Sequence, residues 1–171
     1  MSSRLRVLRG LLDPGPSTLA TLRAHVDDDG DVVFNPDGKR RQRELTPTTS
    51  FLRALEDALV QRGCMRGRYV GGAVVLHSEP GCRRQQWHTD YDPDALVGLR
   101  RKPQGLLVAL QAGTTFVTPD ATYELAPGDA VLFDGDVVHA GGAYRHANTR
   151  VHLYLDVEGV ERQLNKTWLV V

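Results

Sequence analysis

The stretch LAPGDAVLFDGDVVHA, residues 125–140, decides the fold class of this 171-residue chain. Two short runs rich in Val, Leu and Phe predict strands over Ala130–Phe133 and Asp136–Ala140. Each run follows a tight-turn sequence, Pro127-Gly128-Asp129 and Asp134-Gly135-Asp136, whose residue types supply the backbone angles that turns need. Short strands joined by tight turns indicate an antiparallel sheet.

The same pattern extends outward from this stretch over most of the chain after Tyr69. Further strands are predicted over Tyr69–His77, Gln85–Asp90, Gly105–Leu110, Thr114–Thr118, Thr122–Leu125, Arg150–Val157 and Thr167–Val170. So many short strands, separated by Gly, Pro and Asp turns, predict a mainly β architecture of the barrel or jelly-roll kind.

The N-terminal part of the chain has a different character. An apolar stripe predicts a helix over Ser50–Arg62, and a shorter helix is predicted over Leu19–Val26. The acidic, Gly/Pro-interrupted and then basic segment between the helices predicts a loop with one strand near Val32–Phe34. Its basic run, Lys39–Arg43, is expected to be part of a solvated loop, and a contact with substrate is the alternative.

We therefore expect one domain over residues 1–171, in which an N-terminal helical and loop layer (1–68) packs on a β-rich core (69–171). The 21 basic and 21 acidic side chains give a net charge of zero, which argues against a general nucleic-acid-coating protein. No apolar run approaches the roughly 18 residues of a membrane span. The two cysteines lack C-x-x-C spacing, which favours a reducing compartment, so we expect a soluble, intracellular protein of the cytoplasm or the nucleus.

Three residues form a candidate metal site. His88 and Asp90 occupy positions i and i+2 of a predicted strand, so both side chains point to the same face. His139, at the end of the opening stretch, is the natural third ligand. Two histidines and one carboxylate on one side of an iron ion form the facial triad of non-haem Fe(II) oxygenases.

Arg150 is a candidate anion-binding residue in the strand that follows. Strand alternation places Arg150, His152 and Tyr154 on one face, and the apolar residues Val151, Leu153 and Leu155 on the other. A cationic face would be costly against an apolar core without partners. It is explained if Arg150 faces a pocket that holds a carboxylate, which arginine binds through two parallel hydrogen bonds.

In order and spacing, His88-x-Asp90, His139 and Arg150 resemble the Fe(II)- and 2-oxoglutarate-dependent dioxygenases, over about residues 69–157. The resemblance implies a double-stranded β-helix (jelly-roll, cupin-like) core with the N-terminal helices packed on it. It implies that His88, Asp90 and His139 form the catalytic iron site and that Arg150 binds 2-oxoglutarate. O2 would then be consumed, with hydroxylation of a substrate and release of succinate and CO2.

His152 occupies a position where some of these relatives carry a serine that also touches 2-oxoglutarate. An imidazole N–H could replace that contact, which makes His152 a candidate cofactor-binding residue, although it could also be a packed strand residue. The basic run Arg100-Arg101-Lys102 follows the His-x-Asp motif, where relatives build the substrate entrance. It is either a solvated loop or a contact for an acidic or phosphate-bearing substrate.

Two other functions stay open at this point. A cupin-type metal dioxygenase would use the triad without 2-oxoglutarate, and Arg150 would then not affect cofactor affinity. A non-catalytic β-barrel binding module would keep the pocket and form no succinate. For the enzyme, a peptide side chain, a nucleobase and a small metabolite are all possible substrates.

Overall fold

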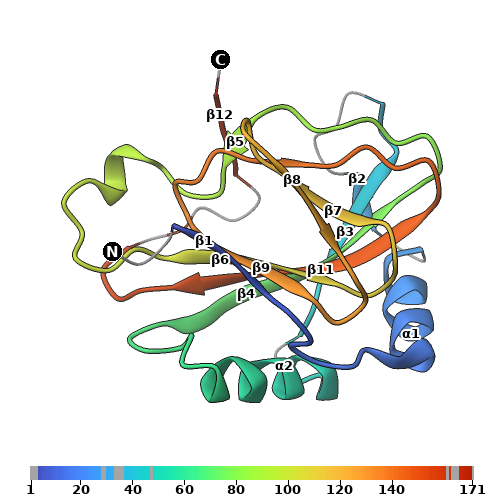
Figure 1. Ribbon diagram of the computed structural model, residues 1–171, viewed down its shortest axis with the longest axis horizontal. Coiled ribbons are helices and arrows are strands. Elements are labelled where there is room, and N and C mark those ends of the chain that lie inside the picture. The colour runs from blue at the N-terminus through green and yellow to red at the C-terminus, as the bar shows by residue number, and fades with distance from the viewer. Residues whose placement is uncertain are drawn as a thin grey trace.

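Two antiparallel sheets face each other in the computed structural model, which describes residues 4–27, 30–32, 37–46, 48–160, 162 and 166–170. The larger sheet has the strand order β1 (Leu5–Leu8), β9 (Ala130–Asp134), β6 (Gln104–Ala109), β11 (Asn148–Asp156), β4 (Tyr69–Ser78), β3 (Arg40–Glu44) and β2 (Asp31–Val32). The smaller sheet consists of β10 (Ala140–Gly141), β7 (Thr114–Val117) and β8 (Thr122–Leu125). A separate ribbon pairs β12 (Trp168–Leu169) with β5 (His88–Thr89). This arrangement confirms the predicted jelly-roll core (Figure 1).

Two helices cover the outer face of the larger sheet. The helices α1 (Gly15–Asp27) and α2 (Ser50–Gln61) contribute apolar side chains to one cluster with β4, β6 and β11. Helix α2 begins where the Thr49 hydroxyl accepts a hydrogen bond from the Leu52 backbone N–H at 3.4 Å. In Figure 1 this helix runs along the sheet below β4. None of the described helices is long and apolar enough to cross a membrane.

The two faces of β11 separate the core from the pocket. Val151, Leu153 and Leu155 are fully buried in the cluster beneath the helices. The alternate residues, Arg150, His152 and Tyr154, line a pocket between the two sheets. The predicted alternation along this strand is therefore confirmed. Because β11 pairs with both β4 and β6, its pocket-facing side chains stand at the centre of the larger sheet.

The N-terminal segment differs from its prediction as a helical and loop layer, because it also supplies β1, β2 and β3 to the larger sheet. The prediction of a solvated loop over Lys39–Arg43 is wrong: Arg40–Glu44 pairs with β4, and the side chain of Arg40 is completely buried. This strand can lack apolar residues because Arg40 and Gln42 on its inner face line the pocket instead of the core. Of the strand predicted near Val32–Phe34, β2 includes Val32, and residues 33–36 lie outside the described residues.

Two strand predictions near the histidines are also too long. The segment predicted as a strand over Asp136–Ala140 begins as a turn, in which the Val137 N–H donates to the Asp134 carbonyl, and strand β10 starts only at Ala140. Strand β5 is likewise limited to His88–Thr89. An isolated bridge between His88 and His139 joins the two segments. The turn residues around Gly135 therefore bend the chain instead of extending it.

A buried carboxylate, Asp129, fixes the turn before β9 to the N-terminal segment. It accepts hydrogen bonds from the backbone N–H groups of Gly10 (2.9 Å) and Ala126 (3.1 Å) and pairs with Arg9. We expect Asp129→Ala to reduce the free energy of unfolding at pH 7 by about 2 kcal/mol, because the N–H groups of Gly10 and Ala126 lose a charged acceptor. Urea denaturation measures this effect, and the exposed turn residue Asp120, replaced by alanine, serves as the control.

The effect of this variant depends on pH. Burial raises the pKa of Asp129, but the hydrogen bonds from Gly10 and Arg9 outweigh burial, so the pKa lies below its usual value of 3.8. The carboxylate therefore stabilises the folded state above about pH 4, and this contribution is lost as the pH falls further. The difference in stability between wild type and Asp129→Ala should shrink as the pH falls from about 4 to about 2. A difference that is constant over this range would contradict the assigned role.

Candidate active site

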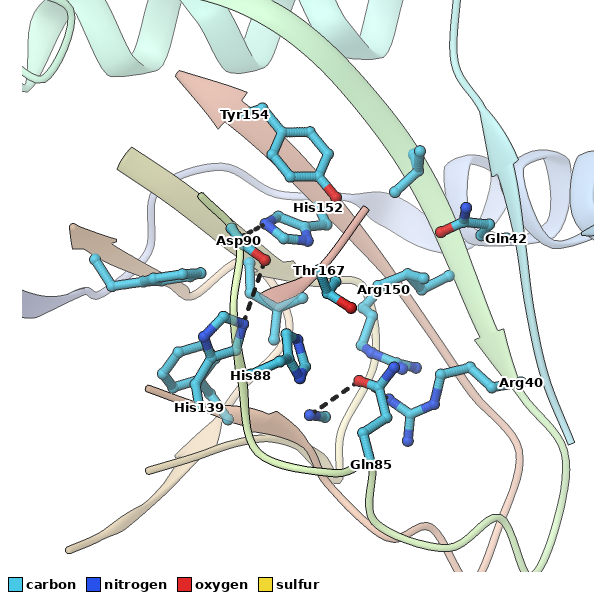
Figure 2. A pocket seen from close by; sticks show the side chains of 16 residues that line it. Arg40, Gln42, Gln85, His88, Asp90, His139, Arg150, His152, Tyr154 and Thr167 are labelled. Atoms are coloured by element: carbon cyan, nitrogen blue, oxygen red, sulfur yellow. Dashed lines mark hydrogen bonds and ion pairs between the residues drawn. The ribbon is translucent and has the colours of Figure 1, made fainter. Parts of the chain in front are cut away.

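The predicted metal ligands lie together in the pocket. One ligand atom each from His88, Asp90 and His139 lie within 4.8 Å of one another, and all three side chains are buried. Strand β5 carries His88, and the bridge to His139 consists of two backbone hydrogen bonds of 3.0 and 2.9 Å. His139 Nε2 lies 3.6 Å from Asp90 Oδ1 (Figure 2). Residues that are distant in sequence therefore present three donor atoms to one point.

Backbone carbonyl groups fix the orientation of both imidazoles. The Nδ1 atom of His88 lies 2.9 Å from the Gln86 carbonyl oxygen, and that of His139 lies 2.9 Å from the Val137 carbonyl oxygen. A carbonyl oxygen only accepts hydrogen bonds, so each Nδ1 carries the proton. The Nε2 lone pairs are then available for a metal ion, as in many histidine metal sites.

The three groups have the charge states that a metal site needs. Burial lowers the pKa of His88 below its usual value of 6.5 and that of His139 to about 4, so both imidazoles are neutral at neutral pH. Burial alone would raise the pKa of Asp90. The neighbouring histidines, His152 first among them, outweigh burial and hold this pKa well below its usual range. Neutral imidazoles and a carboxylate bind a divalent cation without first losing protons.

Aromatic rings enclose the site on one side. The ring of Phe116 stacks on His139 with centroids 5.0 Å apart, and Phe133 lies 4.7 Å from the same imidazole. Gly105 is needed beneath them, because a Cβ there would lie 2.3 Å from the Phe133 ring and 2.7 Å from Asp90 Oδ2. This apolar wall holds the imidazole of His139 in place and excludes water from it.

His152 faces the same carboxylate. Its Nε2 lies 3.1 Å from Asp90 Oδ2, although the two atoms do not have hydrogen-bond geometry and neither has another partner among the described residues. A buried carboxylate oxygen without a hydrogen bond is costly, and a metal cation would remove that cost. The structure therefore places His152 beside the proposed iron ligand, while its predicted contact with 2-oxoglutarate stays a prediction.

Arg150 lines the same pocket and is 1% exposed. Its Nη1 donates to Ser78 Oγ (3.1 Å) and to the Asn148 carbonyl (3.3 Å), whereas its Nη2 has no partner among the described residues. Burial lowers the pKa of Arg150 to about 10, so the group is still a cation at neutral pH. A buried cation with a free donor fits an anionic ligand.

Sequence reasoning missed two residues beside Arg150. Ser78 is fully buried at the end of β4, and its hydroxyl accepts from Arg150. Arg40 reaches the pocket from β3, within the run predicted to be solvated. Neither residue has a local sequence signal. Their places follow from the pairing of β3 with β4 and of β4 with β11, between segments far apart in the chain.

The second basic run does not line this pocket. Arg100 and Arg101 are exposed, and Lys102 pairs with Asp136 at 2.5 Å. The ammonium group of Lys102 is thus already neutralised by a neighbouring carboxylate. A substrate contact by this run stays a hypothesis that concerns the two arginines.

Comparisons with known proteins show which solved structures share this fold. No protein-family model matches the chain, and no curated protein matches it in sequence. A solved structure of the viral collagen prolyl hydroxylase vCPH from Paramecium Bursaria Chlorella virus-1, a 2OG complex, is similar with a TM-score of 0.67 and 14% identity, covering 91% of this chain and 97% of that one. HygX from Streptomyces hygroscopicus, with nickel and 2-oxoglutarate bound, has a TM-score of 0.68 and 12% identity, covering 93% and 85%.

A third similar structure has a different activity. SnoN, described as a non-haem alpha-ketoglutarate-dependent epimerase from nogalamycin biosynthesis, has a TM-score of 0.69 and 16% identity, covering 90% of this chain and 78% of that one. At these identities the comparisons show the fold alone, which this chain shares with the three proteins. The predicted jelly-roll core is thereby confirmed.

Proposed function

We propose that this protein is an Fe(II)- and 2-oxoglutarate-dependent dioxygenase that hydroxylates its substrate with release of succinate and CO2. One observation carries the proposal. A buried His88–Asp90–His139 triad and a buried arginine with a free donor, Arg150, line the same pocket. The pocket belongs to a fold shared with proteins whose structures hold 2-oxoglutarate.

The residues of the pocket fit both groups. His88 and His139, through Nε2, and the carboxylate of Asp90 would hold Fe(II) and leave coordination positions open to the pocket. Iron with 2-oxoglutarate supplies the chemistry that activates O2. Arg150 would bind the carboxylate of 2-oxoglutarate that is distant from the metal and so orient the cosubstrate. Phe133 and Phe116 would exclude water from the histidine side.

Hydroxylation is the outcome that we propose. The similar structures include two proteins named as prolyl hydroxylases and one named as an epimerase, so the fold serves more than one outcome. Hydroxylation needs no catalytic side chain other than the groups that hold the metal and the cosubstrate. Epimerisation needs, in addition, a group that returns a hydrogen atom to the opposite face of the substrate carbon.

The proposal is tested by a spectrum followed by product analysis. We expect metal-free protein, mixed anaerobically with Fe(II) and 2-oxoglutarate, to develop a weak visible charge-transfer band. Admission of O2 should then yield succinate, even without the natural substrate. Zn(II) in place of Fe(II) is the control and should give neither signal. Absence of both the band and succinate with Fe(II) would contradict the proposal and favour a cupin-type enzyme or a binding module.

A further inference from the structure

A second buried arginine, Arg40, enters the pocket from β3. Its side chain is completely buried, and the groups to which its guanidinium donates carry no charge. Nη1 donates to Gln85 Oε1 at 3.2 Å, and Nη2 donates to the carbonyl of Gly142 at 2.8 Å. Its Nε has no hydrogen-bond partner among the described residues. A cation buried with uncharged partners alone is costly, so its position calls for an anion.

Arg40 and Arg150 share one aromatic platform. The guanidinium carbons lie 5.8 Å and 4.8 Å, respectively, from the ring centroid of Tyr144. The Tyr144 hydroxyl donates to the Thr115 carbonyl at 3.2 Å, which fixes the ring. Figure 2 shows both guanidinium groups directed to the same region of the pocket, beside Gln85.

This arrangement brings two positive charges together with little solvent to screen them. The two guanidinium groups repel each other, and each would attract the carboxylate of a ligand. Cation–π contact with Tyr144 offsets part of the cost. A carboxylate that contacts both cations would offset more of it, and the free Nη2 of Arg150 and Nε of Arg40 are donors for such a group.

We propose that Arg40 is a second cationic residue of the subsite for the distal carboxylate of the cosubstrate, and that together with Arg150 it makes this subsite selective for a charged end group. The inference rests on the proposed function. A 2-oxo acid without a distal carboxylate leaves both guanidinium groups buried without a counter-charge. We therefore expect it to bind more weakly than 2-oxoglutarate.

Gln85 connects this subsite to the metal ligands. Its Oε1 accepts from Arg40 Nη1 and from the Gly141 backbone N–H at 3.1 Å. Gln85 precedes His88 by three residues, and Gly141 follows His139 by two. The segments that carry the two histidines are therefore held against the guanidinium of Arg40, which fixes the distance between the two ends of the cosubstrate site.

The test compares two ligands and two matched variants. Binding to Fe(II)-loaded protein is measured anaerobically by calorimetry, with 2-oxoglutarate and with 2-oxovalerate, which keeps the oxo-acid end and lacks the distal carboxylate. Arg40→Met should weaken 2-oxoglutarate binding roughly 10- to 100-fold, since a charge-assisted hydrogen bond is lost. Its affinity for 2-oxovalerate should stay within about twofold of wild type, because no lost contact involves that ligand. The control is Arg41→Met on the same strand, where Arg41 pairs with Glu79 at the surface, and it should change neither affinity.

The outcomes separate three explanations. An equal loss for both ligands in Arg40→Met would show that Arg40 only supports the structure, and it would overturn the inference. Unchanged 2-oxoglutarate affinity would also overturn it. Failure of the wild type to bind 2-oxoglutarate would instead overturn the proposed function on which the inference rests. If Arg40→Met does not fold, Arg40→Lys carries the test, because it keeps the charge but loses the planar fork, and it should show a smaller loss confined to 2-oxoglutarate.

Discussion

Replacement of Asp90 by alanine is expected to abolish iron binding and succinate formation. Asp90 is the sole carboxylate of the triad and is 2% exposed, so no neighbouring acid of the described pocket lining can take its place. Loss of a group that only supports a metal ligand costs about 10- to 100-fold, so loss of the ligand itself should exceed 100-fold. Iron per protein after desalting and succinate formed under O2 are the two measurements.

The matched control for this variant is Asp94→Ala, which removes an exposed carboxylate four residues after Asp90. It should keep wild-type iron content and turnover. Circular dichroism tests whether Asp90→Ala is folded. We expect that it is, because the contacts of Phe116 and Phe133 with His139 do not involve the carboxylate. Full iron content together with full activity in folded Asp90→Ala would exclude Asp90 as a ligand.

Replacement of Arg150 by methionine should act on the cosubstrate and spare the metal. A buried guanidinium that pairs with a carboxylate contributes about 3–5 kcal/mol when one partner is removed, which corresponds to a loss of affinity of more than about 100-fold. We therefore expect the KM for 2-oxoglutarate to rise by more than that factor, while iron content is unchanged. The effect should exceed that of Arg40→Met, since Arg40 makes more of its contacts with backbone groups.

Arg145→Met is the control for this second variant. Arg145 precedes the same strand, is exposed, and lies outside the pocket lining, so its loss should leave the KM unchanged. An unchanged KM for 2-oxoglutarate in Arg150→Met would favour a cupin-type dioxygenase that uses the triad alone. Loss of iron in the same variant would show that Arg150 supports the metal site instead of the cosubstrate.

Much of this site could be predicted from the sequence because strands repeat every two residues. That period puts His88 with Asp90 and separates Arg150 from the apolar face of β11, without knowledge of the neighbouring strands. The structure brings His139 to the same cluster, although a turn and an isolated bridge replace the strand predicted over it. Its position depends on the bridge to His88, and that bridge needs a turn before it rather than a strand.

The burial of Arg40 in the pocket could not be predicted from the sequence. The residues Arg40-Arg41-Gln42-Arg43 contain no apolar side chain, so the pattern that indicates a half-buried strand is missing. The inner face of β3 needs none, because Arg40 and Gln42 on that face line the pocket and not the core. The burial of Arg40 depends on its pairing with Ser78, thirty-eight residues later. The residues around Arg40 do not indicate such a distant pairing.

The two ends of the pocket lie on parts of the backbone that differ in local stability. Arg150 lies on β11, which is hydrogen-bonded along both edges and packed against the helices, so we expect its amides to be among the last to exchange hydrogen. His88 lies in a two-residue strand and His139 in a single bridge to it, so fewer backbone hydrogen bonds must break for this part of the chain to open. Local opening there would admit or release a metal ion while the rest of the barrel stays closed.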